Sequence, residues 1–316
     1  MRIKILELLT EEKFVSGVSL AKKLNVSRTA IWKQIKILQK YGYLIETVKN
    51  KGYRLISRPD VPIFEEITEG INTTIIGKKI LYFKTIDSTN LYAKKLAKNG
   101  VEEGTIVVSE IQNSGRGRKN RSWSSPKGGL WFSVILYPNI PPQKAMLVTM
   151  ASSVAVAQGI IETTGLTPVI KWPNDLLIDN KKVCGILTEL DAEMDKINYS
   201  VVGIGINVNN EIDDNLKDTA TSLSKQTKAN ISRVKLLRSI IKNFDKNYSK
   251  LIDKDYNSIR KNWLSCSNII GKRVQVTDEK SVVDGLVTDV DDNGCLIVNT
   301  SKENVRVVSG DLITLI

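Results

Sequence analysis

The 316-residue sequence contains no histidine. Its absence excludes Ser-His-Asp triads, Cys-His pairs, histidine zinc sites and imidazole acid-base chemistry. Catalysis would then depend on Lys, Arg, carboxylates, amides, backbone groups and a hard cation. That set of groups favours phosphoryl or nucleotidyl transfer over most hydrolytic reactions.

Cysteine is also scarce, and no apolar run has the length of a membrane span. Cys184, Cys266 and Cys295 lie far apart without metal-ligand spacing, which predicts reduced thiols. Residues 145–161 are the most apolar stretch, but they are rich in Ala, Ser and Thr and predict a buried helix. Residues 1–4 lack the long apolar core of a secretion signal. We therefore expect a cytoplasmic protein without membrane partners.

Positive charge is concentrated at one end of the chain. Residues 1–58 contain thirteen Lys/Arg and four Glu, so they carry +9 of the net charge of +12. Such a distribution indicates that this part of the chain binds a polyanion.

The basic segment has the pattern of a winged helix-turn-helix. Apolar spacing predicts helices at 3–9, at 18–24 and from a Ser27 cap to about residue 40, and then strands at 44–48 and 53–56 joined by a basic turn. A helical bundle with solvated lysines is the alternative. The residues expected to contact DNA, the first three at base edges or phosphates, are Ser27, Arg28, Thr29, Trp32, Lys33, Lys36, Lys49 and Lys51.

A proline-containing connector at residues 58–62 separates this unit from the rest of the chain. Beyond it, tight turns between strands favour a mixed, largely antiparallel sheet. Predicted strands are 80–83, 105–109, 130–136, 169–172, 176–178, 183–190 and 200–208, with helices at 88–98, 145–161 and 233–263. Short strands from residue 271 (273–277, 281–290, 295–299 and 305–308) predict a small barrel. The fold class is α+β, with domains 1–62, 63–270 and 271–316.

A cationic loop is the most informative segment. Residues 111–127 contain five Lys/Arg and no Asp or Glu, with Gly115 and Gly117 among the cations and Trp123 at the end. A solvated surface loop is the simplest interpretation of charge and glycine alone. The terminal aromatic and the glycine hinges instead favour a mobile lid over a phosphate-bearing ligand.

Polar clusters follow other strands. Residues 87–90 open a helix, where Ser88 and Thr89 can cap it or bind a ligand, and Gln112 precedes the cationic loop. Residues 171–175 (Lys-Trp-Pro-Asn-Asp) and Lys182 combine cations with groups that suit Mg²⁺. Residues 203–207 (Gly-Ile-Gly-Ile-Asn) lack the third glycine and the helix of a dinucleotide fingerprint. Their glycines would let a ligand approach the backbone.

Together the Gly-Arg-Gly-Arg segment with Trp123, Lys-Trp-Pro-Asn-Asp, Lys-x-x-Gly-Ile-Leu at 182–187 and Gly-Ile-Gly-Ile-Asn resemble the biotin–protein ligases. The preceding winged helix-turn-helix resembles the bifunctional kind, which is also the biotin operon repressor. The resemblance implies a class II synthetase-like central domain and an SH3-like C-terminal barrel. It also implies ATP and biotin as substrates with Mg²⁺, a biotin carboxyl carrier domain and operator DNA as partners, and a homodimer promoted by biotinyl-5′-AMP.

The resemblance also implies residue roles. Catalytic residues would be Arg118, Lys171 and Lys182, and metal ligands Asn174 and Asp175. Biotin would be held by Ser88, Thr89, Asn90, Gln112, Gly115, Arg116, Gly117, Arg118, Lys182 and Gly185. ATP or the adenylate would be held by Arg118, Arg121, Trp123, Lys171, Asn174 and Asn207. Lys119-Asn120 departs from the family pattern, which commonly has another basic residue and a glycine there.

Two further interpretations compete with this one. A ligand-sensing transcription factor would bind without reacting, but the intact Lys171, Asn174, Asp175, Arg118 and Lys182 argue against it. A lipoate ligase would have a related fold. The cationic loop combined with the DNA-binding segment argues against that assignment.

Overall fold

The computed structural model describes residues 1–278 and 281–314. They belong to two compact units, Met1–Gly70 and Ile71–Ile316. The boundaries expected at residues 62 and 270 stay a prediction.

The first unit is a winged helix-turn-helix, as the sequence predicts. Ser16 and Ser27 cap the second and third helices, because their hydroxyls accept hydrogen bonds of 3.1 Å from the backbone N–H groups of Ser19 and Ala30. Its elements are α1 (Arg2–Leu8), α2 (Gly17–Leu24), α3 (Arg28–Lys40), β1 (Leu44–Val48), β2 (Gly52–Ser57) and α4 (Phe64–Thr68). The short α4 was not expected from the sequence. Buried Leu20, Ile31 and Ile35 form part of the core between α2 and α3.

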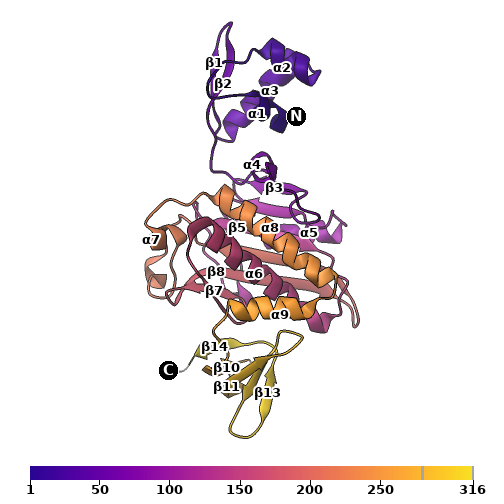
Figure 1. Cartoon of the computed structure of the whole chain (residues 1–316), viewed down its shortest axis with the longest axis vertical. Coiled ribbons are helices and arrows are strands. Elements are labelled where there is room, and N and C mark those ends of the chain that lie inside the picture. Colours follow the sequence, from indigo (N-terminus) through magenta and orange to yellow (C-terminus); the bar gives the residue numbers. More distant parts are fainter. Residues whose placement is uncertain (279–280, 315–316) are drawn as a thin grey trace. The chain divides into compact units, whose positions relative to one another are not determined.

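The second unit is built on a seven-stranded sheet (Figure 1). In spatial order its strands are β3 (Ile80–Phe83), β4 (Ile106–Ser109), β5 (Leu130–Leu136), β9 (Ile197–Ile206), β8 (Lys181–Ala192), β7 (Asp175–Ile178) and β6 (Val169–Lys171). Only the pair β3–β4 is parallel among the described strands, so the predicted mixed, largely antiparallel sheet is confirmed.

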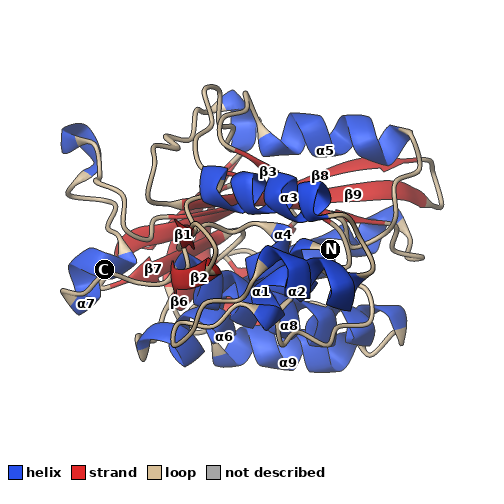
Figure 2. Ribbon diagram, turned by 90° about the horizontal axis from the view of Figure 1, so that it is seen from above, coloured by secondary structure: helices blue, strands red, loops and turns tan. Residues whose placement is uncertain are grey.

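Helices cover both faces of this sheet (Figure 2). One face carries α5 (Thr89–Lys98), and the other carries α6 (Ala145–Thr164), α8 (Arg233–Ile252) and α9 (Tyr256–Ser265). The short α7 (Leu223–Thr227) follows the loop after β9. The segment containing α6, Pro142–Thr164, is long and apolar enough to cross a membrane, but 72% of its most apolar window is buried inside the protein. It is a core helix, as the sequence predicts.

The prediction of one helix over 233–263 was wrong. The helix ends at Ile252 and a second one begins at Tyr256, because Lys254 adopts a left-handed φ of 60°. Asp255 then caps α9 by accepting a hydrogen bond of 3.2 Å from the Ser258 backbone N–H. Apolar periodicity continues across this break and therefore does not reveal it.

The chain ends in a five-stranded antiparallel sheet. Its spatial order is β13 (Asn304–Val307), β12 (Leu296–Asn299), β11 (Val282–Val290), β10 (Arg273–Thr277) and β14 (Asp311–Thr314). The turn at residues 292–294 has Gly294 at a φ of 82°, which suits glycine. The last strand, β14, was not expected from the sequence. Residues 279–280 and 315–316 of the expected domain 271–316 lie outside the described residues.

Candidate functional site

A cavity lies over strands β5, β8 and β9, between the start of α5 and the cationic loop. Most of the residues chosen from the sequence line it: Ser88, Thr89, Asn90, Gln112, Arg116, Gly117, Arg118, Arg121, Trp123, Asn174, Asp175, Lys182 and Gly185. The fold therefore brings together segments that are up to about 100 positions apart in the sequence. Their shared chemistry is cationic and amide-rich, which suits an anionic ligand with several polar groups.

Three predicted residues do not line this cavity. Gly115 is a buried residue of the cationic loop itself, and a Cβ there would lie 2.3 Å from the Trp123 carbonyl oxygen. Lys171 pairs in register with Asp175 and is half-buried on the edge strand β6. Asn207 is buried, and its Oδ1 accepts a hydrogen bond of 3.1 Å from Asn210.

Trp123 packs directly against the strand glycines. A Cβ on Gly205 would lie 2.5 Å from Trp123 Nε1, and one on Gly185 would lie 2.8 Å from the same ring. The indole also makes an edge-on contact with Trp131, with ring centroids 6.4 Å apart. These glycines were expected to admit a ligand. In this structure Trp123 occupies the space beside Gly185 and Gly205, and Asn90 occupies the space beside Gly203.

The cationic loop folds back on itself. The Trp123 N–H donates to the Gly115 carbonyl at 2.9 Å, and the Gly117 N–H donates to the Arg121 carbonyl at 2.7 Å. At the tip, Lys119 and Asn120 have left-handed φ values of 52° and 58°. Asparagine tolerates this conformation better than most residues do. Lys119 and Asn120, which depart from the family pattern, therefore form a tight turn at the tip of the loop.

The loop is held by the C-terminal sheet. Asp311 accepts hydrogen bonds from Arg121 at 2.6 Å and Lys119 at 3.3 Å, and the Gly310 carbonyl accepts one from Arg118 at 3.3 Å. Burial opposes ionisation of Asp311, but the bonds from Lys119 and Arg121 outweigh it and hold the pKa of this carboxyl below its ordinary value. Asp311 is therefore an anion that the loop cations already bind.

Cations also contact the two predicted metal ligands. Arg118 donates a hydrogen bond of 2.9 Å to Asn174 Oδ1, and Lys182 lies 2.7 Å from Asp175 Oδ1. Burial lowers the pKa of Arg118, although nearby Asp311 and Asp175 oppose that change. The Lys182 ammonium also lies 5.1 Å from the centroid of the Trp123 ring, in cation–π range. Two positive charges thus converge at one end of the cavity.

The start of α5 forms the opposite end of the cavity. Ser88 caps the helix by accepting from the Leu91 N–H at 3.4 Å, so its predicted capping role is confirmed. Gln112 Oε1 accepts from the backbone N–H of Thr89 at 2.8 Å and lies 3.0 Å from the Thr89 hydroxyl. Gln112 also donates to Ser125, at the end of the cationic loop, at 2.8 Å. Hydrogen bonds therefore link the helix start to the loop.

Three polar residues beside the cavity were missed from the sequence. Ser133 contacts Thr89 and Asn90, Glu189 contacts Asn90, and Asp311 binds the loop. Ser133 is the one polar residue in the apolar strand Leu130–Leu136, a signal that could have identified it. Nothing local in the sequence marks Asp311, because its role depends on how the C-terminal sheet packs.

A second surface lies on the first unit, in a groove between α2, α3 and the β1–β2 hairpin. Arg28, Thr29, Trp32 and Lys49 line it, and the Trp32 side chain is 50% exposed. Lys33, Lys36 and Lys51 are exposed outside the groove lining, and Ser27 uses its hydroxyl as the helix cap. A basic helix and a basic hairpin on one groove suit the DNA backbone and an adjacent major groove.

The chain matches three family models. Residues 2–54 match the HTH domain, residues 82–207 the biotin/lipoate A/B protein ligase family, and residues 269–313 the biotin protein ligase C-terminal domain. Among solved structures, the biotin protein ligase from Aquifex aeolicus in complex with biotin and ATP is similar, with a TM-score of 0.66 and 30% identity over 75% of this chain and 100% of that chain. Fold and site thus define a protein ligase of the biotin/lipoate class with a DNA-binding domain.

Curated relatives narrow this class. The chain is 40% identical to the bifunctional ligase/repressor BirA of Bacillus subtilis (strain 168) over 99% of this chain and 98% of the relative. It is 28% identical to the bifunctional ligase/repressor BirA of Escherichia coli (strain K12) over 94% of this chain and 91% of that relative. The chain therefore belongs to the family of bifunctional biotin ligase/repressors.

Proposed function

We propose that this chain activates biotin with ATP and transfers the biotinyl group to a lysine of a biotin carboxyl carrier domain, in the cytoplasm. The observation that carries the proposal is the cationic loop closed over the cavity, with Arg118 and Lys182 beside Asn174 and Asp175. The relatives named as ligases, and the Aquifex aeolicus ligase bound to biotin and ATP, support the same reaction.

In the first step the biotin carboxylate oxygen attacks the α-phosphorus of ATP. A new carboxyl–phosphate bond forms, and the bond to the β-phosphate oxygen breaks with release of pyrophosphate. Both reactants are anions, so catalysis consists mainly of holding them together and stabilising charge. Arg118 and Lys182 line the cavity and supply that charge, whereas Lys171 on the adjacent edge strand would act from outside the cavity.

In the second step the acceptor lysine amine attacks the biotinyl carbonyl carbon. An amide forms, the bond to the phosphate breaks, and AMP leaves with the electron pair. Until then the mixed anhydride must be shielded from water. Arg118 and Trp123 on the cationic loop would close over the adenylate, with Arg121 and Asn174 contributing to its phosphate side.

The biotin end of the cavity would be formed by the start of α5 and the adjacent strands. Ser88, Thr89 and Gln112 offer short, fixed polar groups there. Gly117 and Gly185 expose backbone, and Arg116 supplies a cation at the same end. Asn90 lines the cavity, but its amide already bonds to protein groups, so we assign it a supporting role.

Asn174 and Asp175 would hold Mg²⁺. Asp175 Oδ1 is buried and its ion-pair partner is the Lys182 ammonium at 2.7 Å, so Mg²⁺ would replace that ammonium on this oxygen. One carboxylate and one amide oxygen fit Mg²⁺, which usually keeps waters and takes further oxygens from substrate phosphates. The cation would neutralise phosphate charge during adenylation. No cluster of three or more His, Cys, Asp or Glu occurs among the described residues, so the ATP phosphates would complete this site.

The first unit would repress transcription of biotin genes. Its groove combines Arg28, Thr29, Trp32 and Lys49 on two elements, as in DNA readers that place a helix in the major groove. One such unit reads a short half-site, so a dimer promoted by biotinyl-5′-AMP would fit a palindromic operator. Ordering of residues 112–123 by the adenylate would couple catalysis to DNA affinity. Deleting residues 1–62 should abolish operator binding and leave ligase activity.

Exchange of labelled pyrophosphate into ATP tests the first reaction. The proposal expects exchange that depends on biotin and on Mg²⁺ and that a large excess of lipoate does not replace. A protein that binds biotin without exchange would be a ligand-sensing transcription factor instead. Exchange supported by lipoate and not by biotin would make the chain a lipoate ligase.

A further inference from the structure

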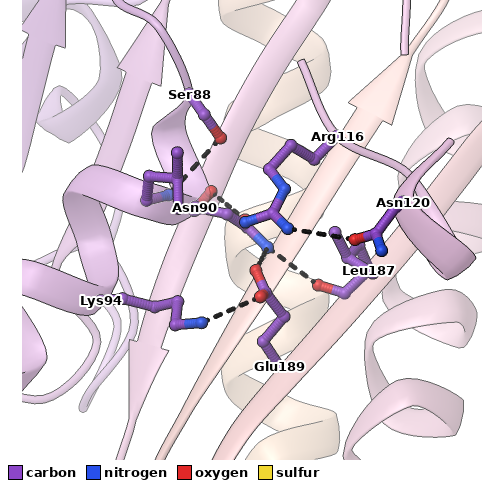
Figure 3. Close-up of polar contacts among 9 residues, drawn as sticks. Ser88, Asn90, Lys94, Arg116, Asn120, Leu187 and Glu189 are labelled. Atoms are coloured by element: carbon purple, nitrogen blue, oxygen red, sulfur yellow. Dashed lines mark hydrogen bonds and ion pairs between the residues drawn. The ribbon is translucent and has the colours of Figure 1, made fainter. Parts of the chain in front are cut away.

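A chain of polar groups, of which Thr89, Asn90 and Ser133 are buried and Glu189 is half-buried, joins the cavity to helix α5 and strand β8. The Glu189 carboxylate lies between the Lys94 ammonium, at 3.0 Å, and the Asn90 amide, at 3.0 Å (Figure 3). The Asn90 Oδ1 lies 2.6 Å from the Ser133 hydroxyl, which lies 2.7 Å from the Thr89 hydroxyl. Thr89 lines the cavity, whereas Glu189 lies outside its lining.

The orientation of the Asn90 amide is fixed by its neighbours. Its Nδ2 faces two groups that can only accept hydrogen bonds, Glu189 Oε2 and the Leu187 carbonyl oxygen at 3.3 Å. Burial opposes ionisation of Glu189, but hydrogen bonds from Asn90 and Lys94 outweigh it and hold its pKa below the ordinary value. The carboxylate therefore stays charged near neutral pH, and Asn90 Oδ1 must point toward Ser133.

Ser133 then has one proton for two contacts. Asn90 Oδ1 can only accept, so the Ser133 proton goes to it. The Thr89 hydroxyl donates its own proton to Gln112 Oε1 at 3.0 Å, so only the Ser133 proton could fill the Thr89 lone pair that faces Ser133 at 2.7 Å, and Asn90 Oδ1 competes for that proton. Thr89 is consequently a donor toward the protein and keeps its oxygen lone pairs available. Glu189 therefore orients Asn90, Asn90 holds the Ser133 proton, and the chain ends at Thr89 beside the cavity, with each bond polarising the next.

We propose that Glu189 is a positioning residue that makes the Thr89 hydroxyl a hydrogen-bond acceptor for an N–H group of the ligand. A cyclic urea, as in biotin, supplies such N–H donors, so the inference rests on the proposed function. Glu189 acts through Asn90 and Ser133 and touches no substrate. Reversing the Asn90 amide would place its NH₂ opposite Ser133, turn the Ser133 proton onto Thr89 and fill the Thr89 lone pair that faces it.

The test replaces Glu189 by glutamine in the full-length chain. Lys94 attracts the new amide oxygen and turns its NH₂ toward Asn90, which weakens the fixed orientation. We expect the Kd for biotin, measured by calorimetry, and the KM for biotin to rise about tenfold, which corresponds to loss of about one hydrogen bond between neutral groups. The KM for ATP and kcat at saturating biotin should change less than about twofold.

Two further variants distinguish the proposed relay from a purely structural effect of the Glu189→Gln substitution. Lys94→Gln removes the ion pair but leaves the carboxylate on Asn90, so biotin affinity should stay within about twofold. Ser133→Ala interrupts the relay, since no hydroxyl then links Asn90 to Thr89, whose own proton stays on Gln112. When Glu189→Gln is added to Ser133→Ala, the biotin Kd should rise less than about twofold further. If Glu189→Gln instead raises the biotin Kd about tenfold both with and without Ser133, the relay is overturned.

A second double variant covers the case in which Glu189→Gln fails to fold. Lys94→Ala with Glu189→Gln removes the ammonium that holds the new amide oxygen, so this oxygen can turn to Asn90 Nδ2, and the double variant should bind biotin within about threefold of wild type. A loss of tenfold or more in a folded double variant contradicts the proposal. If the wild-type protein exchanges pyrophosphate into ATP in the presence of biotin and Glu189→Gln binds biotin normally, the relay is overturned and the proposed ligase function still holds. If the wild-type protein does not bind biotin, the proposed ligase function itself is wrong.

Discussion

Arg121 Nη2 lies 2.6 Å from Asp311 Oδ2, which joins the cationic loop to the last described strand of the C-terminal sheet. The same carboxylate binds Lys119, and the neighbouring Gly310 carbonyl binds Arg118. The loop that we propose as a lid over the nucleotide is therefore attached to a second structural element through its own cations. This contact gives the small C-terminal sheet a direct connection to the site.

Asp311→Asn should loosen the loop without destabilising the protein. Arg121 and Asp311 are 66% and 37% exposed, and exposed ion pairs contribute about 0–1 kcal/mol. We expect an almost unchanged Tm and faster tryptic cleavage after Arg118, Lys119 or Arg121. Asp284→Asn, which removes the exposed pair with Arg273 in the same sheet, is the matched control and should leave cleavage at the loop unchanged. Equal cleavage rates in all three proteins would contradict the anchoring role.

Arg118→Gly should release activated biotin. Arg118 bonds to Asn174 and to the Gly310 carbonyl, so its removal detaches the loop from both sides of the cavity. The variant should fold, form the adenylate and label lysines on unrelated bystander proteins several-fold more than wild type does, as detected by avidin blot. Arg273→Gly serves as the control on an exposed arginine. Labelling confined to the carrier domain would argue against a lid role for Arg118.

Gly205→Ala should displace Trp123. The added Cβ would lie 2.5 Å from Trp123 Nε1, so the ring has to move. We expect an altered tryptophan emission spectrum and at least a tenfold rise in the KM for ATP. Gly100→Asn is the control, because nothing lies within 4 Å of a Cβ there and asparagine tolerates its φ of 67°. Retained emission and KM in Gly205→Ala would show that Trp123 does not pack on this glycine.

Acid should remove the contribution of Glu189 to stability. Its folded-state pKa is below the ordinary value of 4.5, so the folded state binds the proton less readily than the unfolded state does. The stabilisation is complete above about pH 4.5 and is lost as the pH falls through the folded pKa. The Tm of wild type should exceed that of Glu189→Gln from about pH 7 to pH 5.5, and the difference should shrink toward about pH 3.5. A constant difference over that range would contradict the assignment.

Local patterns in the sequence predicted most of the fold. Ser27 and Ser88 cap the helices they were expected to cap, and the strands at 80–83 and 130–136 have the predicted bounds. The break at Lys254 escaped prediction because a left-handed residue interrupts an otherwise continuous apolar pattern. Strand β14 was missed because its four residues carry little periodicity.

The sequence predicted those parts of the candidate site in which several functional side chains lie within one short segment. Arg116, Arg118 and Trp123 share one loop, and that loop does line the cavity. Ser133 stands out as the polar residue in an apolar strand, but its contact with Asn90, 43 positions away, could not be predicted, and neither could the contacts of Glu189 and Asp311. Pairing of strands and packing of the C-terminal sheet create those contacts, and neither is visible in a local pattern.

Incubation of the full-length protein with biotin, Mg²⁺-ATP and a biotin carboxyl carrier domain tests the central claim most directly. An avidin blot should show a biotinylated carrier only when all three are present, with no signal from a carrier whose acceptor lysine is replaced by arginine. A carrier that stays unlabelled under saturating biotin and ATP would contradict the assignment of ligase activity to this cavity.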